Sequence, residues 1–298
     1  MMDDRSKSYY FKYLPAAPRD RDWGWHVSAI GWSRVQAHEH YPPAAHPQGY
    51  DYEWPHNRVL QEFQCIYITR GQGTFQTKAS GRHNIKAGSL FFLFPDQPHR
   101  YTPDPKTGWD EHWVSFDGDM PRQLLEKGIL SLNRPVYAVG LNPSILRCYN
   151  DILDIVEAQE AGSSPIAAML TAQLVARARA TTGQVDEPAQ QRMRKAMFRI
   201  EEDVDRVINF EQLATELHMG YAPFRHQFKR YAGLSPKQYH IQLRISKAKS
   251  LLTNTTLNIN EIASAMHFDS PYYFMRYFKQ RTEMSPTEWR QYSRGDTH

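Results

Sequence analysis

Two stretches of the chain, residues 210–230 and 259–281, carry cationic and aromatic side chains in one shared arrangement, offset by 49 or 50 residues. In each stretch, apolar residues at three- and four-residue steps predict a helix, a short turn and a second helix. In the second helix, hereafter the reading helix, two phenylalanines are expected to face inward and a mostly polar set of side chains outward. The outward side chains are Tyr221, Ala222, Arg225, His226 and Lys229 in the first copy, and Tyr272, Tyr273, Met275, Arg276 and Lys279 in the second.

These side chains suit contact with double-stranded DNA. A helix pair whose second helix enters the major groove is the helix-turn-helix arrangement. Arg225 and Arg276 are expected to form paired hydrogen bonds with guanine, because the planar guanidinium matches both acceptors of that base. Lys229 and Lys279 are expected to contact phosphates. One such hairpin would be weak evidence, whereas two copies at a fixed interval are strong.

The C-terminal third is also the basic part of the chain. From residue 190 onward there are 17 Lys and Arg against 11 Asp and Glu, a net charge of +6, whereas the preceding residues hold 19 against 21, a net charge of −2. A basic surplus alone is weak evidence for nucleic acid, because most surface charge is only solvated. Here it coincides with the duplicated helix pair, which favours DNA binding.

Between the two copies, residues 235–252 are expected to form one capped amphipathic helix carrying Arg244, Lys247 and Lys249. About 16 residues at roughly 1.5 Å each make a rod of about 24 Å. With the width of the flanking units, this rod is expected to hold the reading helices about 34 Å apart, one turn of DNA. Two units on a stiff connection add their binding energies, which explains the duplication.

The N-terminal part has the pattern of a β-domain. Between residues 23 and 139, short β-rich runs separated by turns predict an antiparallel barrel or sandwich. Residues 37–57 are rich in His and Pro without periodicity, which predicts a long surface loop. Helical spacing then predicts two antiparallel helices within residues 142–180, which either only close the β-domain or also pair two subunits.

One predicted strand, residues 109–116, carries side chains that suit a sugar. Alternation places Trp109, Glu111 and Trp113 on one face of this strand. Indole rings pack against the apolar C–H surface of a sugar, and a carboxylate binds its hydroxyls. In the alternative interpretation, the tryptophans belong to the core and Glu111 is exposed.

Composition excludes some classes of protein. The 298 residues, 41% hydrophobic and 23% charged, are those of an ordinary soluble globular chain. No apolar run approaches the roughly 20 residues of a membrane span, and the first residues lack the apolar stretch of a signal peptide, so we expect a cytoplasmic protein without membrane contact. Cys65 and Cys148 are expected to be reduced, buried thiols rather than a disulfide or a zinc site.

The repeated region resembles the DNA-binding module of the AraC/XylS family of bacterial transcription regulators. The resemblance covers residues 208–252 and 259–292, with "FKRYAGLSPKQYH" and "YYFMRYFKQRTEMSPTEWR" as its most specific stretches. One departure is His267, where the family usually has glycine, and this residue is expected to strain the second turn. The resemblance implies that Ala222, Arg225, His226, Tyr272, Tyr273 and Arg276 lie on base-reading positions.

Part of the β-domain resembles the cupin-type effector domain of the same family. The stretches are "TRGQGTF", "AGSLFFLFPDQPHRY" and "TGWDEHWVSFDG". This resemblance implies a ligand pocket that includes Arg58, Tyr101 and Trp113, to which we add His99 and Glu111 because they lie beside these residues. It also implies that an N-terminal arm, here the aromatic segment before Trp23, folds over the ligand.

We therefore predict an α+β chain of two domains. A cupin-like antiparallel β-barrel with two C-terminal helices (residues 1–181) binds the effector and dimerises, residues 182–191 are a linker, and an all-α domain with two helix-turn-helix motifs (residues 192–298) binds DNA. The predicted function is a sequence-specific regulator, an activator of carbohydrate-utilisation genes controlled by a sugar. Its predicted partners are DNA, the sugar, RNA polymerase and a second copy of the chain; no cofactor and no metal is expected.

Two other functions remain open from the sequence. Cupin barrels often hold a metal, and His38 to His40, with Glu53, His56 and His99, supply metal-ligand types, so the chain can be a metal-dependent enzyme. These residues lie mostly in a Pro-rich loop rather than on a strand, which weighs against that interpretation. The chain can also be a constitutive regulator whose barrel only dimerises.

Overall fold

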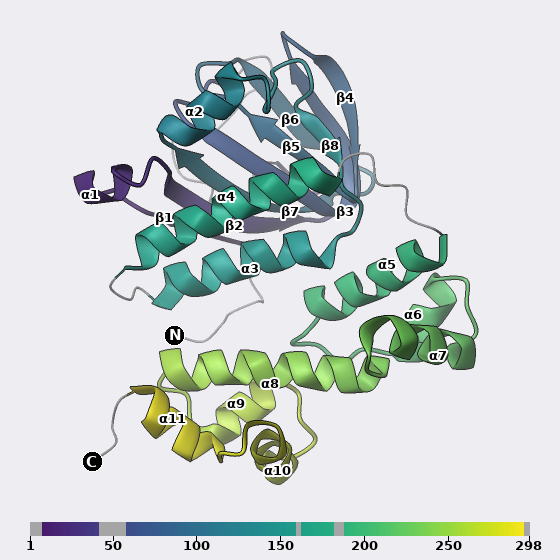
Figure 1. Cartoon of the computed structure of the whole chain (residues 1–298). Coiled ribbons are helices and arrows are strands. Elements are labelled where there is room, and N and C mark those ends of the chain that lie inside the picture. The colour runs from purple at the N-terminus through teal and green to yellow at the C-terminus, as the bar shows by residue number, and fades with distance from the viewer. Residues whose placement is uncertain (1–7, 42–57, 159–161, 182–187, 295–298) are drawn as a thin grey trace. The chain divides into compact units, whose positions relative to one another are not determined.

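The computed structural model describes residues 8–41, 58–158, 162–181 and 188–294. The chain divides into two compact units, Met2–Gln184 and Val185–His298, each of which is described by itself (Figure 1). The first unit is an antiparallel β-sheet with helices and the second is entirely helical, as the predicted α+β class requires. Within the described residues, no helix combines the length and the apolar character needed to span a bilayer.

The strands of the first unit form, among the described residues, one eight-stranded sheet with the order β1-β2-β7-β3-β5-β8, and β4 and β6 pair with β3. The strands are β1 (Tyr9–Tyr13), β2 (His26–Val35), β3 (Phe63–Thr77), β4 (Gly81–Lys86), β5 (Ser89–Leu93), β6 (His99–Pro103), β7 (Trp109–Asp117) and β8 (Val136–Ala138). The helices of this unit are α1 (Pro18–Arg21), α2 (Asp119–Glu126), α3 (Pro143–Ala158) and α4 (Ser163–Thr181).

Strand β3 joins the two parts of this sheet. Its first half pairs with β7 and β5, and its second half pairs with β4 and β6. Between the halves the register shifts from Ile68 to Arg70, and Gly71 adopts a φ of +77°. A side chain at Gly71 would lie 2.1 Å from the carbonyl oxygen of Gly108, so only glycine fits at this bend.

Helices α3 and α4 lie side by side across one face of the sheet (Figure 1). The hydroxyl of Tyr149 on α3 donates to the carbonyl oxygen of Cys65 on β3 at 3.1 Å, and its ring stacks on Tyr67. Cys65 and Cys148 are free and buried, as expected from the sequence, and burial raises the pKa of the Cys65 thiol to about 12. The helices therefore shield this face, and the opposite face lines the interior of the barrel.

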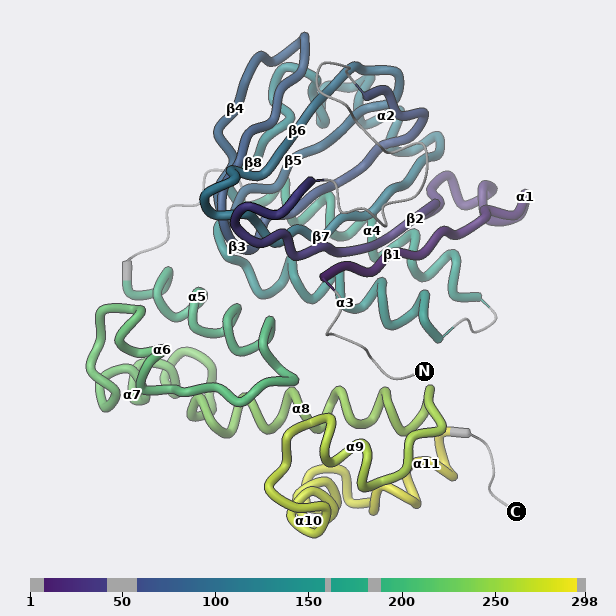
Figure 2. Tube along the Cα trace, turned by 180° about the vertical axis from the view of Figure 1, so that it is seen from behind, coloured from purple at the N-terminus to yellow at the C-terminus, as the bar shows by residue number. Residues whose placement is uncertain are grey.

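The second unit is built around its longest helix, α8, with one helix pair at each end (Figure 2). Its helices are α5 (Pro188–Glu202), α6 (Phe210–Glu216), α7 (Tyr221–Ala232), α8 (Pro236–Asn254), α9 (Ile259–Ala265), α10 (Pro271–Thr282) and α11 (Pro286–Arg294). Helix α8 has 19 residues, so it is about 28 Å long, somewhat longer than the sequence predicts.

The two helix pairs, α6–α7 and α9–α10, repeat one construction. The four phenylalanines of the reading helices are fully buried, as predicted, and the small Ala214 and Ala263 lie where each pair crosses. Asn209 and Asn258 cap the first helix of each pair through their side-chain oxygens. Each pair therefore encloses its own small core.

The turn inside each pair contains a histidine with left-handed backbone. His267 has a φ of 50°, and His218 at the equivalent position of the first pair has a φ of 56°. The strain expected at His267 is thus present in both copies. Because glycine enters this region without steric cost, both histidines hold a conformation that a glycine would hold more easily.

The end of each reading helix gives a test of backbone strain. Gly233 ends α7 with a φ of 77°, whereas Glu283 ends α10 with a φ of 65° at the equivalent position. We expect Glu283→Gly to raise the free energy of unfolding of the second unit by about 1 kcal/mol, and Gly233→Ala to lower it by about as much. Hydrogen exchange of the α7 and α10 amides in the full chain measures both. Glu283→Ala is the control, and a gain equal to that of Glu283→Gly would contradict the backbone explanation.

Candidate functional site

The reading helices α7 and α10 present nearly all of the predicted DNA-binding side chains to solvent. Tyr221, Ala222, Arg225, His226, Lys229, Tyr272, Arg276 and Lys279 are exposed. The exception is Tyr273, which is half-buried against neighbouring rings. Arg225 and Arg276 are therefore accessible to a ligand outside the unit, as guanine recognition requires.

A buried arginine braces the two helix pairs. Arg244, one of the cations expected along the helix between the copies, is only 9% exposed. Its guanidinium donates to the carbonyl oxygens of Val204 (3.3 Å) and Arg206 (2.8 Å), which precede the first pair, and of His267 (3.1 Å), which lies in the turn of the second. The sequence analysis names Arg244 only as one of three cations on the helix between the copies, and the structure gives it a structural role.

Each pair is also held by one residue at an equivalent position, His240 for the first pair and Arg290, 50 residues later, for the second. His240 lies with its Nε2 atom 3.1 Å from the carbonyl oxygen of Val204, and Arg290 donates to the carbonyl oxygens of Leu252 (3.2 Å) and Leu257. Burial, together with the positive charge of the neighbouring Arg244, lowers the pKa of His240 to about 4, so the imidazole is neutral near pH 7. These contacts fix the segment that leads into each helix pair.

In the first unit, Glu111 is the polar centre of the barrel interior. It is 5% exposed, so the interpretation with an exposed Glu111 is wrong, although Trp109 does belong to the core. The Ser33 hydroxyl donates to its carboxylate at 2.8 Å, and the Tyr41 hydroxyl lies 3.3 and 3.4 Å from its two oxygens. Sequence reasoning missed both donors, since Ser33 belongs to a different strand and Tyr41 to the predicted surface loop.

The other predicted ligand residues surround this carboxylate. The Tyr101 ring lies between the rings of His99 (6.3 Å) and Trp109 (6.1 Å), and 6.1 Å from the ring of Tyr41. Arg58 pairs with His99 through two backbone hydrogen bonds of 2.9 Å. The structure thus brings Arg58, His99, Tyr101, Glu111 and Trp113 into one neighbourhood.

The aromatic segment near the N-terminus forms a strand. Residues Tyr9–Tyr13 make β1, which pairs with β2 along its length. Phe11 lies opposite Gly31, and Gly31 lies opposite Trp113, so Phe11 is on the same face of the sheet as Trp113. Lys12 points the other way and donates to the carbonyl oxygen of Val156 at 2.7 Å. The segment therefore extends the wall of the barrel rather than crossing its mouth.

Burial controls the charges in this interior. It raises the pKa of the Glu111 carboxyl to about 7, against the opposing effect of the Ser33 and Tyr41 hydrogen bonds and the positive charge of Arg58. Burial, together with the positive charge of Arg58, lowers the pKa of His99 to about 4, against the opposing effect of the hydrogen bond with Gln97. Near pH 7 the interior thus holds a neutral imidazole and a carboxyl that is protonated in part of the molecules.

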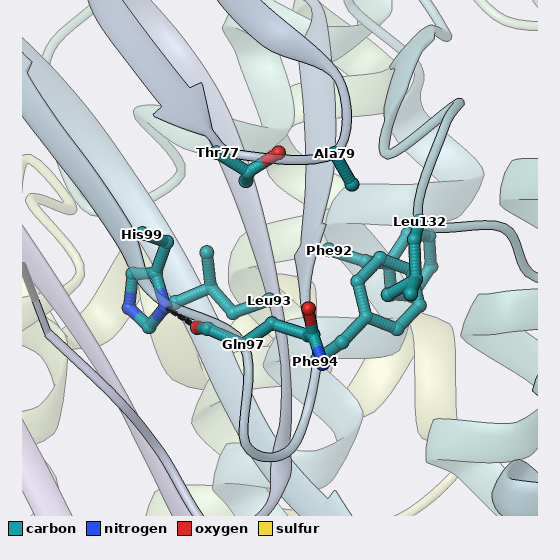
Figure 3. A pocket seen from close by; sticks show the side chains of 8 residues that line it. All are labelled: Thr77, Ala79, Phe92, Leu93, Phe94, Gln97, His99 and Leu132. Carbon is teal, nitrogen blue, oxygen red and sulfur yellow. Dashed lines mark hydrogen bonds between the residues drawn. The ribbon is translucent and has the colours of Figure 1, made fainter.

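A small cavity lies beside His99, on the side where its Nδ1 atom meets the carbonyl oxygen of Gln97 (Figure 3). Its walls include Phe92, Phe94 and Leu132, and its volume is about 10 Å³. That volume holds about one water molecule, so this cavity is too small for a sugar.

The residues proposed for a metal site are described only in part. Within the described ranges, no three His, Cys, Asp or Glu side chains lie close enough together to hold a metal ion. His38 to His40 and His99 are among the described residues, whereas Glu53 and His56 lie outside them.

Each of the two units matches a family of known proteins, and several similar proteins match across most of the chain. A family model described as an AraC-like ligand binding domain matches residues 38–175, and one described as a helix-turn-helix domain matches residues 213–292. The chain is 24% identical over 240 residues to the MmsAB operon regulatory protein of Pseudomonas aeruginosa, covering 77% of this chain and 75% of that protein. It is 28% identical over 235 residues to the arabinose operon regulatory protein of Escherichia coli (74% and 77%) and 23% identical over 250 residues to the raffinose operon transcriptional regulatory protein of Pediococcus pentosaceus (80% and 88%).

The titration of Glu111 predicts how stability depends on pH. Because its pKa is raised to about 7, the native state keeps a proton that the unfolded chain releases near pH 4.5. As pH rises from about 4.5 to about 7, the free energy of unfolding of the unchanged protein should fall relative to that of Glu111→Gln, by up to about 1.4 kcal/mol per pH unit. Ser33→Ala should extend the loss to higher pH, because the Ser33 hydroxyl stabilises the carboxylate. Urea denaturation at a series of pH values measures this, and parallel profiles for the protein and Glu111→Gln would contradict it.

Proposed function

Since both matched domains are those of the AraC/XylS family, the chain belongs to that family of transcription regulators, and we propose that it binds operator DNA and activates carbohydrate-utilisation genes in response to a sugar. The observation that carries the DNA-binding part is the pair of reading helices with exposed arginines, braced by a single buried arginine. A fixed spacing between two readers allows their binding energies to add.

Each exposed side chain has a proposed role at the DNA. Arg225 and Arg276 bind guanine through paired hydrogen bonds. Ala222, His226 and Tyr272 lie against base edges, and Tyr221 lies at the rim of the contact. Tyr273, predicted from the sequence to contact a base, is half-buried beside Arg276. Lys229 and Lys279 bind phosphates and fix the position of the helices on the duplex.

The proposed effector site is the barrel interior around Glu111. Tyr101 and Trp113 are half-buried aromatic side chains that can pack against the C–H surface of a sugar, while Glu111, Arg58 and His99 bind its hydroxyls. The names of similar proteins support this class of effector, because they include regulators of arabinose and raffinose operons and a lactose operon transcription activator of Staphylococcus xylosus.

We further propose that the regulator is a homodimer and that, as an activator, it contacts RNA polymerase. Ile166 and Met169 on α4 are 49% and 38% exposed, which supports a pairing role for this helix in addition to its packing on the sheet. The sugar controls the regulator only if it binds one arrangement of the dimer better than another.

A matched pair of substitutions tests the DNA contacts. Arg276→Ala should weaken binding to duplexes selected from a random library by about 1–3 kcal/mol and relax the preference at one base position. Lys279→Ala should weaken binding to selected and random duplexes alike and reduce the salt dependence of the affinity. Titrations by fluorescence anisotropy at several salt concentrations measure both. An equal loss on selected and random DNA for Arg276→Ala would refute its base-reading role.

Calorimetry tests the sugar. Among a panel of mono- and oligosaccharides, at least one should bind the full chain, and Trp113→Ala should weaken that binding by about tenfold or more, because a packed aromatic wall is lost. Trp23→Ala is the control, since Trp23 is 55% exposed and lies outside the interior cluster. The sugar proposal fails if the panel gives no heat while other metabolites bind.

A further inference from the structure

The second reading helix holds a ladder of aromatic rings that includes two tyrosines, and neither tyrosine has an aromatic counterpart at the equivalent position of the first reading helix. The ring of Tyr273 lies between those of Phe268, in the turn, and Tyr277, one helical turn further along α10, with centroid distances of 6.2 and 6.0 Å. The backbone N–H of Tyr273 donates to the capping hydroxyl of Ser270 at 3.1 Å. Backbone and side chain of Tyr273 are therefore both fixed at the start of the helix.

This ring supports the arginine proposed to read guanine. The guanidinium carbon of Arg276 lies 5.8 Å from the centre of the Tyr273 ring, a cation–π geometry between residues three apart on one helix. Arg276 itself is exposed. An exposed arginine loses side-chain conformational entropy when it binds DNA, and this loss weakens binding. Stacking on Tyr273 before binding restricts the side chain in advance, so less entropy is lost at the binding step.

The first reading helix has a different construction at the equivalent positions. With the offset of 50 residues, Arg276 corresponds to His226, Tyr273 to Pro223 and Tyr277 to Gln227. Arg225 corresponds to Met275 rather than to Arg276. The two arginines thus occupy different positions on their helices, and only the second helix supplies a supporting ring.

We infer that Tyr273 is a positioning residue, which holds Arg276 in the orientation that reads guanine and makes the DNA half-site of α10 the more selective of the two. This inference rests on the proposed DNA binding. Tyr273 then acts on the DNA through Arg276, which accounts for its burial among rings, whereas the sequence pattern places it in direct contact with a base. The proposed role depends on the aromatic ring of Tyr273 and not on its hydroxyl. Tyr273→Phe should therefore keep the preference for guanine.

The test is selection from a random duplex DNA library by the full chain, followed by sequencing. The unchanged protein should select a guanine in the half-site that Arg276→Ala relaxes. Tyr273→Phe should keep this preference, whereas Tyr273→Leu and Tyr273→Met should reduce it by about three- to tenfold at that position alone. In an Arg276→Ala background, Tyr273→Leu should change the selected sequence no further.

Tyr277→Phe is the matched control. It keeps the ring that lies beside Tyr273 and removes only the hydroxyl that accepts from Arg281 at 3.2 Å. The control should leave the guanine preference in place. Thermal unfolding of every variant shows whether the second unit is intact, and Tyr273→Met serves if Tyr273→Leu is unfolded.

The possible failures are distinguishable. If the unchanged protein enriches no sequence, the proposed DNA binding itself fails. If it enriches one and the aliphatic Tyr273 variants keep the same guanine preference, or lose preference equally at every position, the positioning role is overturned. A loss in Tyr273→Phe equal to that in Tyr273→Leu would also overturn it, because the hydroxyl would then be the active group.

Discussion

The second unit depends on the hydrogen bonds of one buried guanidinium. Arg244 binds backbone carbonyls on both sides of α8, so the segment before the first helix pair and the turn of the second pair share one anchor. Burying a charge is costly unless its donors are satisfied, and three carbonyl oxygens supply that compensation here. Each pair also packs against α8 through its own core, and the anchor adds a direct link between the segment before the first pair and the turn of the second. Duplication is useful only with the relative position of the two pairs fixed, since loosely connected readers gain little from each other.

The first unit depends on a comparable constraint, the bend of β3. One strand contributes its first half to the pairing with β7 and its second half to the pairing with β6, so Glu111 on β7 and Tyr101 on β6 meet in one interior. Gly71 permits the bend because no side chain fits beside Gly108. Two residues of the proposed ligand site, Glu111 and Tyr101, therefore come from strands that do not pair with each other but both pair with β3.

Much of this was predictable from the sequence, because periodicity reports which face of an element is apolar. The inward phenylalanines of the reading helices and the shared face of Glu111 and Trp113 both follow from spacing alone. Spacing does not tell a buried cation from an exposed one, so the role of Arg244 was not predictable. Nor does it show cross-strand partners, so Ser33 and Tyr41 were missed beside Glu111, and the N-terminal segment was expected to be an arm rather than strand β1. In each case the missing information is which distant segment packs against the residue.

The two units use buried ionisable groups in opposite ways. The hydrogen-bond partners of Arg244 and Glu111 are neutral, carbonyl oxygens for the cation and hydroxyls for the carboxyl. For each group burial is the largest effect on the pKa, and it favours the neutral form. Arginine starts so far above neutrality that it stays charged, so its anchor is permanent across the pH range in which proteins fold. Glutamic acid starts a few units below neutrality, and the same effect brings it to about 7, where a small change in its surroundings changes its charge. A ligand hydroxyl that donates to Glu111 is such a change. A permanent charge thus suits the anchor between the two helix pairs, and an adjustable charge suits the proposed effector site around Glu111.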